Sequence, residues 1–322
     1  MGIIDLVEIK KYFPIKKGAF SKQGWLKAVD GVRFSIEEGR VFSLVGESGS
    51  GKSTVARLVL RLIPLTSGKI FFRGRDILEF KGESLKEFRK SVQIIFQDPF
   101  ASLNPRMTVF DTLSEPLKIH RIVKRSELKD KVVNLLRSVG LGPEVLNRYP
   151  HEFSGGQRQR ICIARALSVS PAVLVADEPL SALDVSIQAQ ILNILQELKN
   201  QTNISFLFIS HDLRVVQYFS DEIAVMYLGK IVEYAKADDL FSNPLHPYTV
   251  ELLSSVPKIT IRRDAERREA HFMTNKGENP GSVVIPSGCA FHSRCARRFE
   301  PCDNVAPELK EKKGRLVSCH LF

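Results

Sequence analysis

The feature that most constrains this chain is a glycine-rich segment, Gly46-Glu47-Ser48-Gly49-Ser50-Gly51-Lys52-Ser53. It fits the pattern G-x-x-x-x-G-K-[ST], and it follows the apolar run 41–45 and opens a helical pattern over 53–62, the context that such a loop requires. The glycines let backbone N–H groups converge on phosphate oxygens, and the positive end of the following helix adds to that attraction. Lys52 is suited to the β- and γ-phosphates and Ser53 to Mg²⁺. The segment therefore predicts a nucleotide-binding site between a strand and a helix.

The rest of the first 255 residues predicts an α/β domain. Further buried strands are expected at 173–176 and 204–209, and helices at 126–139, 158–167 and 187–199. Alternation of strands and helices favours a mostly parallel sheet. The stretch from about 98 to 170 is richer in helix and turn signals and predicts a helical subdomain.

Composition sets the class of protein. The chain has 322 residues, of which 43% are hydrophobic and 26% charged, which is typical of a soluble globular protein of about two domains. No apolar stretch is long enough to span a bilayer, and the first residues show no secretory signal, so we expect a cytosolic chain. The net charge of +11 leaves three interpretations open: a solvated lysine surface, an anionic membrane face, or nucleic acid.

A second candidate site follows the apolar run at 173–176. Asp177 and Glu178 stand directly after it. Behind a buried strand, in a chain with a phosphate loop, Asp177 suits an indirect role in holding Mg²⁺ and Glu178 that of a base for an attacking water.

A third element is Phe153-Ser154-Gly155-Gly156-Gln157, directly before the helix expected from Arg158. Ser-Gly-Gly at a helix start is either an ordinary N-cap or a second anion-binding device. Two such helix ends in one chain suggest that the second serves a nucleotide held by another molecule.

In order and spacing, these motifs resemble those of ATP-binding cassette (ABC) ATPases, over roughly residues 5 to 255. The residues that carry the resemblance are Gly46–Ser53, Gln97, Ser154–Gln157, Asp177–Glu178, Ser181–Asp184 and His211. Phe153 departs from the leucine that is commonest at the first signature position. The resemblance implies ATP hydrolysis in a head-to-tail dimer, in which each ATP lies between one subunit's phosphate loop and the other's signature.

The resemblance also implies a role for each matching residue. ATP would be contacted by Gly46–Thr54 and Gln97, and across the dimer by Phe153, Ser154, Gly155, Gly156 and Gln157. Mg²⁺ would be held by Ser53, Gln97 and Asp177. Glu178 would be the catalytic base, His211 would contact the γ-phosphate, and Asp184 would bridge the two sites. An aromatic residue before the loop should stack on adenine, with Phe13 preferred over Tyr12.

Other segments are similar to one group within the family. Gln97–Arg106, Asn243–Thr249 and Pro286–Cys295 look like the ATPase subunits of dipeptide and oligopeptide importers, and Lys11–Pro14 like the F subunit rather than its D partner. This similarity implies a heterodimer with a second ATPase subunit beneath two membrane-spanning permease subunits, at the cytoplasmic face of the membrane. It also implies an extracytoplasmic solute-binding protein that delivers the cargo.

The end of the chain, 256–322, predicts a separate extension with a metal site. A charged connector is expected at Arg262–Glu269, and the last 34 residues hold Cys289, Cys295, Cys302 and Cys319 in the spacing C-x5-C-x6-C-x16-C. Zinc sites usually contain closer cysteine pairs, and a reducing compartment disfavours disulfides. A [4Fe–4S] cluster, known in some members of the resembled family, is the preferred ligand, with zinc or free thiols as alternatives.

Two other functions remain as alternatives. One is the same motor role in an importer of oligosaccharides or nickel complexes. The other is a non-transport ABC ATPase that acts on nucleic acid or ribosomes, which would suit the basic charge. Such proteins generally carry a coiled-coil insertion or two cassettes, and this chain has a single phosphate loop and about 100 residues between Ser53 and Phe153, so nucleic acid is not expected as a partner.

Overall fold

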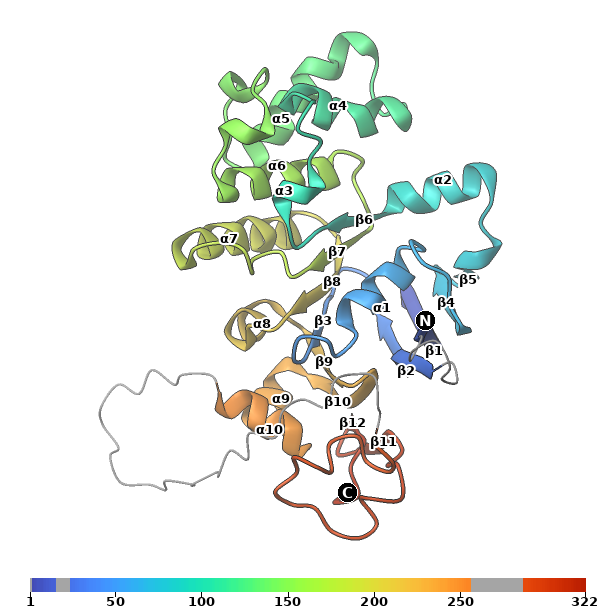
Figure 1. Ribbon diagram of the computed structural model, residues 1–322. Coiled ribbons are helices and arrows are strands. Elements are labelled where there is room, and N and C mark those ends of the chain that lie inside the picture. The colour runs from blue at the N-terminus through green and yellow to red at the C-terminus, as the bar shows by residue number, and fades with distance from the viewer. Residues whose placement is uncertain (1, 16–23, 256–285) are drawn as a thin grey trace, which may run out of the picture.

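A computed structural model describes residues 2–15, 24–255 and 286–322. Its centre is a sheet of eight described strands in the order β11-β12-β10-β9-β3-β8-β7-β6 (Figure 1). The five strands from β9 to β6 run parallel, whereas β10, β12 and β11 continue the sheet antiparallel. The bounds of the eight strands are β3 Val41–Val45, β6 Val92–Ile95, β7 Val173–Asp177, β8 Ser205–Ser210, β9 Glu222–Tyr227, β10 Lys230–Lys236, β11 Lys310–Lys312 and β12 Arg315–Val317.

The central strands form because they are apolar on both faces. Every residue of β3, β7 and β8 is buried, as expected for parallel strands covered on both sides. The strands expected at 41–45, 173–176 and 204–209 are thus confirmed. The covering helices include α1 Lys52–Val59, α7 Val185–Gln201, α8 Leu213–Phe219, α9 Ala237–Ser242 and α10 Pro247–Ser254.

A second, antiparallel sheet was not foreseen. It has the order β2-β1-β4-β5. Its strands are β1 Ile4–Ile15, β2 Gly24–Ile36, β4 Ser67–Phe72 and β5 Arg75–Asp76, followed by η1 Ile77–Glu79 and α2 Gly82–Ser91. Its buried side chains share one core with α1 and with Phe42 and Leu44 of β3, so that α1 is enclosed between the two sheets.

The helical subdomain stands at one end of the molecule in Figure 1, beyond β6. It consists of α3 Pro99–Ser102, α4 Val109–Ile119, η2 Arg125–Glu127, α5 Leu128–Ser138, η3 Pro143–Val145, η4 Pro150–Glu152 and α6 Gly155–Leu167. The helix expected over 126–139 is α5 with η2, and the helix expected from Arg158 begins three residues earlier, at Gly155. Buried leucines and valines of these helices are continuous with one face of the main sheet.

The described part of the extension, residues 286–322, lies beside α10 and β10 at the opposite end of the sheet (Figure 1). Strand β12 pairs with β10 through Glu233 opposite Val317 and Tyr234 opposite Leu316. The connector expected at Arg262–Glu269 lies outside the described residues. Among the helices of the described ranges, none combines the length and the apolar character needed to cross a membrane.

Candidate functional site

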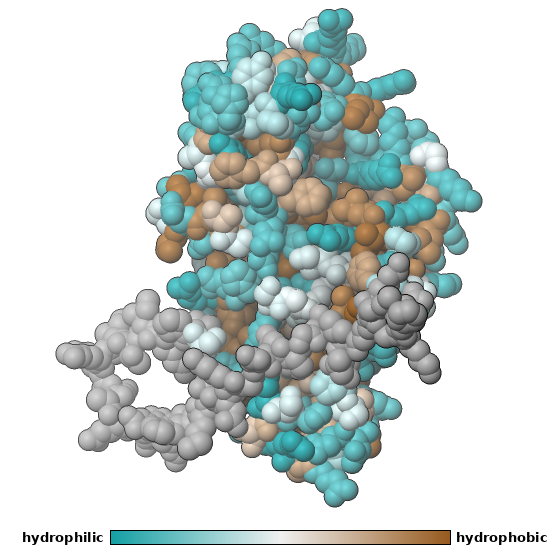
Figure 2. Space-filling view, in the orientation of Figure 1, coloured by the Kyte–Doolittle hydropathy of each residue, from teal (hydrophilic) through white to brown (hydrophobic). Residues whose placement is uncertain are grey.

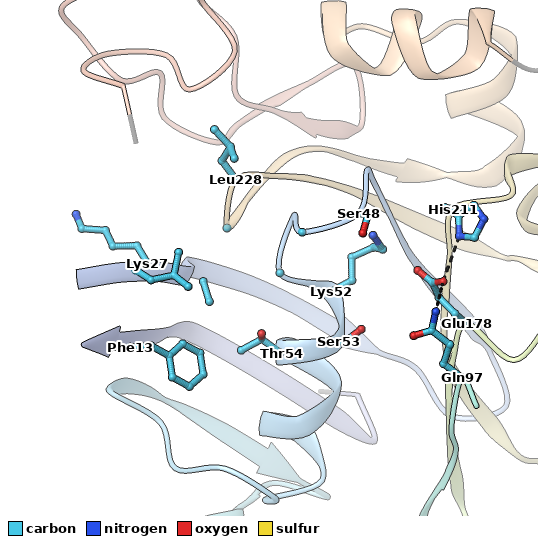
Figure 3. A pocket seen from close by; sticks show the side chains of 15 residues that line it. Phe13, Lys27, Ser48, Lys52, Ser53, Thr54, Gln97, Glu178, His211 and Leu228 are labelled. Carbon is cyan, nitrogen blue, oxygen red and sulfur yellow. Dashed lines mark hydrogen bonds and ion pairs between the residues drawn. The ribbon is translucent and has the colours of Figure 1, made fainter. Parts of the chain in front are cut away.

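The candidate site is a cavity of about 560 Å³ between the phosphate loop, β1, β2 and the end of β9 (Figure 3). This volume is within the range of small-molecule sites. Its lining combines an aromatic and aliphatic part with a polar part. The lining residues are Phe13, Leu26, Lys27, Ala28, Ser48, Gly49, Gly51, Lys52, Ser53, Thr54, Gln97, Glu178, His211, Leu228 and Gly229.

The loop takes its shape from glycine. Gly51 has φ +107°, and a Cβ atom there would lie 2.1 Å from the carbonyl oxygen of Ala28. Gly46 has φ +151°, and its Cβ would lie 2.2 Å from the carbonyl oxygen of Met226. Gly51 precedes α1, and within the described part of the chain no side chain caps this helix. Its first N–H groups are therefore available to an anion.

The Lys52 side chain folds back and bonds to the start of the phosphate loop. Its ammonium donates to the carbonyl oxygens of Gly46 and Glu47, each at 2.8 Å, and the side chain is buried. Burial lowers the pKa of Lys52, and the nearby carboxylates of Glu178 and Asp177 oppose this shift. The Lys52 ammonium is thus held in the lining of the cavity, where it can bind a negatively charged ligand.

Ser53 and Asp177 form the second polar contact. The Ser53 hydroxyl donates to Asp177 Oδ1 over 2.9 Å. Burial raises the pKa of Asp177, and the hydrogen bond from Ser53 acts in the opposite direction. A serine hydroxyl backed by a buried carboxylate is an oxygen donor set that suits Mg²⁺.

Glu178 lies at the centre of a contact between three side chains. Gln97 Nε2 donates to Glu178 Oε2 over 3.1 Å, and His211 Nδ1 is 3.2 Å from the same oxygen, as the dashed lines in Figure 3 show. The three residues follow β6, β7 and β8, which are neighbours in the sheet, so their carboxyl ends bring these side chains to one edge. The backbone of Glu178 has φ +47°.

The two aromatic candidates for adenine point to different places. Phe13 lines the cavity, on the side opposite Glu178 in Figure 3. Tyr12 donates its hydroxyl to Asp30 Oδ1 over 2.5 Å, away from the cavity, and lines a separate groove. Burial and this hydrogen bond raise the pKa of Tyr12. Of the two aromatic residues, Phe13 is therefore the one that can contact a ligand in the cavity.

Several expected site residues are not brought to the cavity. Of the described residues that line it, none belongs to the signature Phe153–Gln157, and neither Asp184 nor Gly46, Glu47 and Ser50 is among them. Phe153 is buried, and Ser154 is the exposed N-cap of α6. The Ser154 hydroxyl accepts the Gln157 N–H, and the Gln157 side chain accepts the Ser154 N–H. Asp184 is the exposed N-cap of α7.

The four tail cysteines gather in the extension without forming a site for one ion. Cys289 N–H donates to the carbonyl oxygen of Cys302 over 2.8 Å. Burial raises the pKa of Cys289 to about 11, and charges on Cys319, Cys302 and Cys295 act in the same direction. Within the described ranges, no three His, Cys, Asp or Glu side chains are grouped so as to hold a metal ion. The expected metal-binding extension is therefore not supported by this geometry.

Sequence reasoning missed part of the cavity wall. Leu26, Lys27 and Ala28 of β2 and Leu228-Gly229, after β9, carry no motif of their own. They reach the cavity because β2 folds over α1 and because the Gly229 N–H donates to the carbonyl oxygen of Ser50. No local signal could have found them.

Comparisons with known proteins place the chain in a family. Residues 29–181 match the family model described as "ABC transporter", and residues 232–302 match "Oligopeptide/dipeptide transporter, C-terminal region". The chain is 50% identical to the oligopeptide transport ATP-binding protein AppF of Bacillus subtilis, over 99% of this chain and 97% of that one. It belongs to the ATP-binding proteins of the oligopeptide and dipeptide ABC transporters. It is also 45% identical to the dipeptide transport ATP-binding protein DppF of Escherichia coli, over 98% of this chain and 93% of that one.

Solved structures agree on the ABC ATPase fold. The dimeric post-hydrolysis structure of the cassette MJ0796, bound to ADP and Pi, superposes with a TM-score of 0.65 at 26% identity and covers 73% of this chain and 98% of its own. CbiO1 of Clostridium perfringens gives a TM-score of 0.64 over 75% of this chain and 91% of its own. The predicted family and the P-loop ATPase fold are confirmed, and the enzyme class is an ABC ATPase.

Proposed function

We propose that this ATPase is a motor subunit of a peptide importer and that ATP is hydrolysed between two ATPase subunits. The observation that carries the proposal is the division of the site. Lys52, Ser53 and Glu178 line one cavity, whereas the signature at Ser154 is exposed on another part of the chain. A head-to-tail partner would bring a second signature to this cavity and accept the one at Ser154.

Different residues of the cavity have different roles in ATP binding and hydrolysis. Phe13 stacks on the adenine, and Lys52 with the N–H groups of the loop and of α1 binds the phosphates. Ser53 and Gln97, with Asp177 behind Ser53, would hold Mg²⁺, which would supply positive charge beside the phosphates. Glu178 takes the proton from the attacking water, and His211 orients the water and the γ-phosphate.

Exposed apolar side chains support a permease partner. Phe96 and Phe100 flank Gln97 and are 38% and 61% exposed. On the face seen in Figure 2, hydrophilic residues dominate and apolar ones gather in the middle of the view, below the helical subdomain. We assign the exposed surface at Phe96 and Phe100 to the permease subunits, which would hold the chain at the cytoplasmic face of the membrane.

Asp184, the exposed N-cap of α7, would bridge the two ATP sites.

The cargo and the remaining partners follow from the relatives. The similar proteins are named for oligopeptide or dipeptide transport, which favours peptides over oligosaccharides or nickel complexes. From the resemblance of Lys11–Pro14 to the F subunit, we propose a heterodimer of F and D ATPase subunits and a separate solute-binding protein. Within the chain, we assign 1–255 to the nucleotide-binding domain, with its helical subdomain at about 98–170, and 256–322 to the extension.

The test of the transport role is assembly with permeases. The chain, produced together with permease subunits and a second ATPase subunit of a peptide importer, should co-purify with the membrane fraction. Phe100→Asp should release it, whereas Leu78→Asp, at a site 45% exposed on η1, should not. Failure of the chain to co-purify with the membrane fraction, together with salt-sensitive DNA binding at physiological ionic strength, would favour the nucleic-acid alternative instead.

We further propose that Cys289, Cys295, Cys302 and Cys319 hold a [4Fe–4S] cluster that stabilises the extension. A cluster takes one cysteine for each iron and spaces its ligands farther apart than a zinc ion does. Cys289 and Cys302 are joined by a backbone hydrogen bond of 2.8 Å, and within the described residues no three such side chains are grouped closely enough for a single ion.

Anaerobically purified protein should absorb broadly in visible light and contain about four iron atoms per chain. Cys302→Ser should lose the iron, whereas Cys162→Ser, in the buried face of α6, should keep it. Iron-free protein with one zinc ion would contradict the cluster.

A further inference from the structure

The extension reaches back to the phosphate loop through Arg294. The guanidinium forms a two-pronged ion pair with Glu47, with Nη1 to Oε2 and Nη2 to Oε1 both at 2.9 Å. Nη2 also donates to Glu251 Oε1 of α10, over 2.5 Å. Arg294 is the residue directly before Cys295, and Glu47 is the second residue of the loop, 247 positions earlier in the chain.

The surroundings of Arg294 are built to hold this geometry. Its side chain is 10% exposed. The guanidinium carbon lies 5.9 Å, 6.0 Å and 5.5 Å from the ring centres of Tyr227, Tyr248 and Phe291. In such a partly buried aromatic setting, a two-pronged arginine–carboxylate pair is stronger and more directional than a surface pair.

The same cluster also holds the backbone of the loop. The Tyr248 hydroxyl accepts the Glu47 N–H over 2.9 Å, while Lys52 bonds the carbonyl oxygens of Gly46 and Glu47. The start of the loop is thus fixed from the cavity side by Lys52 and from the opposite side by Arg294 and Tyr248. Glu47 is not among the residues that line the cavity.

The charges of Glu47 and Arg294 affect how strongly the loop can bind a nucleotide. A carboxylate in a loop that binds a triphosphate repels the ligand unless it is turned away and neutralised. Arg294 does both, since it draws the Glu47 carboxylate toward the extension and supplies the opposite charge. Its additional contact with Glu251 anchors the guanidinium to α10.

We propose that Arg294 is a positioning residue of the ATP site, which keeps Glu47 directed away from the phosphates and makes the cysteine-bearing extension part of the nucleotide-binding machinery. The inference rests on the proposed assignment of Gly46–Ser53 as the phosphate loop.

The test is a double-mutant cycle on the full chain with its partner ATPase subunit, with Mg-ATP as the ligand. Arg294→Gln should raise KM and Kd for ATP about tenfold, the size expected for one uncompensated charge near the phosphates. The turnover at saturating ATP should fall much less. Glu47→Gln in the same chain should restore most of the affinity, because it removes the repelling charge.

Arg298→Gln is the matched control, since Arg298 is an exposed neighbour whose partner Asp303 lies within the extension. It should leave KM unchanged. If Arg294→Gln does not fold, Arg294→Lys keeps the charge without the fork and should give a smaller rise in KM, again relieved by Glu47→Gln.

Unchanged KM in the Arg294 variants would overturn the proposal, and so would failure of Glu47→Gln to restore affinity or an equal rise in Arg298→Gln. A purely structural role predicts lower thermal stability with normal ATP affinity. If the wild-type chain itself bound no ATP, the assignment of the phosphate loop would fail instead, so the two ideas are tested separately.

Discussion

Glu178 combines a backbone conformation that is rare for its residue type with contacts to both Gln97 and His211 at one side of the cavity. Its φ of +47° is in the left-handed region, which costs about 1–3 kcal/mol for a residue other than glycine. The conformation is fixed by its N–H, which donates to the carbonyl oxygen of Ile209 at the end of β8. The neighbouring strands thus determine where the carboxylate points, toward Gln97 and His211.

Glu178→Gln keeps the shape of the side chain and removes its basicity. We expect ATP binding to be retained and hydrolysis in the assembled complex to slow at least about 100-fold, the loss expected for a positioned base. Steady-state ATPase rates and equilibrium ATP binding measure the two quantities separately. Near-normal turnover would remove Glu178 from the role of base.

Phe13 and Tyr12 offer a matched pair for the adenine contact. Phe13→Ala should weaken ATP binding by about 1–3 kcal/mol, as expected on loss of a stacked aromatic ring. Tyr12→Phe should bind ATP normally, because Tyr12 faces Asp30 rather than the cavity. Titration with a fluorescent ATP analogue measures both. Equal losses in the two variants would contradict the assignment.

At the scale of elements, the contacts of α10 explain how the extension is tied to the main domain. His246 is the buried N-cap of α10, its Nδ1 accepts the Tyr248 N–H over 3.0 Å, and its ring packs against Phe291. Glu233 of β10 accepts the N–H groups of Leu245 and His246 and is fully buried. Strand β12 pairs with the same β10, so one strand supports both α10 and the extension.

The burial of His246 predicts a pH dependence. Burial lowers its pKa to about 4, from a usual value of about 6.5. Between these values the unfolded chain binds more protons than the folded one, so this group's contribution makes stability decrease as pH falls from about 6.5 to 4. His246→Asn keeps a good N-cap without the titration and should show a shallower decrease.

Thermal unfolding of both proteins at pH 7, 6 and 5 measures this difference. Groups other than His246 titrate in both chains, and their contributions cancel in the comparison. Parallel profiles would show that His246 does not carry the effect.

At the scale of the whole molecule, the residues proposed for the ATPase site lie in two separate regions. The phosphate loop, Glu178 and His211 line one cavity, and the exposed helix start at Ser154 belongs to the helical subdomain. Because Ser154 already caps α6, its glycine-flanked N-terminus is ordered before any partner arrives. A preformed helix end of this kind is suited to bind phosphates held by another subunit.

This division predicts a dependence on concentration. The specific ATPase activity of the purified chain should fall steeply on dilution and recover when the second ATPase subunit is added. ATPase assays across a wide dilution series, with light scattering for the oligomeric state, measure this. Full activity of a demonstrated monomer would contradict the shared site.

Much of the fold was predictable because its signals are local. Continuous apolar runs identified β3, β7 and β8, and Gly51 with Lys52 identified the loop, since each depends on neighbouring residues in the sequence. The antiparallel sheet of β1, β2, β4 and β5 was missed because its strands are only partly buried and pair across irregular registers. The cavity wall at Leu228 and the pairing of Arg294 with Glu47 depend on contacts over long sequence separations, which no local pattern encodes.

The amino-acid sequence alone determined the family and the phosphate loop and led to the role expected of Glu178, because motif spacing fixes which side chains follow which strand. Only the tertiary structure decided that Phe13 rather than Tyr12 faces the cavity, that the signature lies apart from it, and that Arg294 reaches Glu47. These last features depend on how strands and the extension pack in space. Packing is a property of the whole chain, since each contact requires both of its distant partners to be in place.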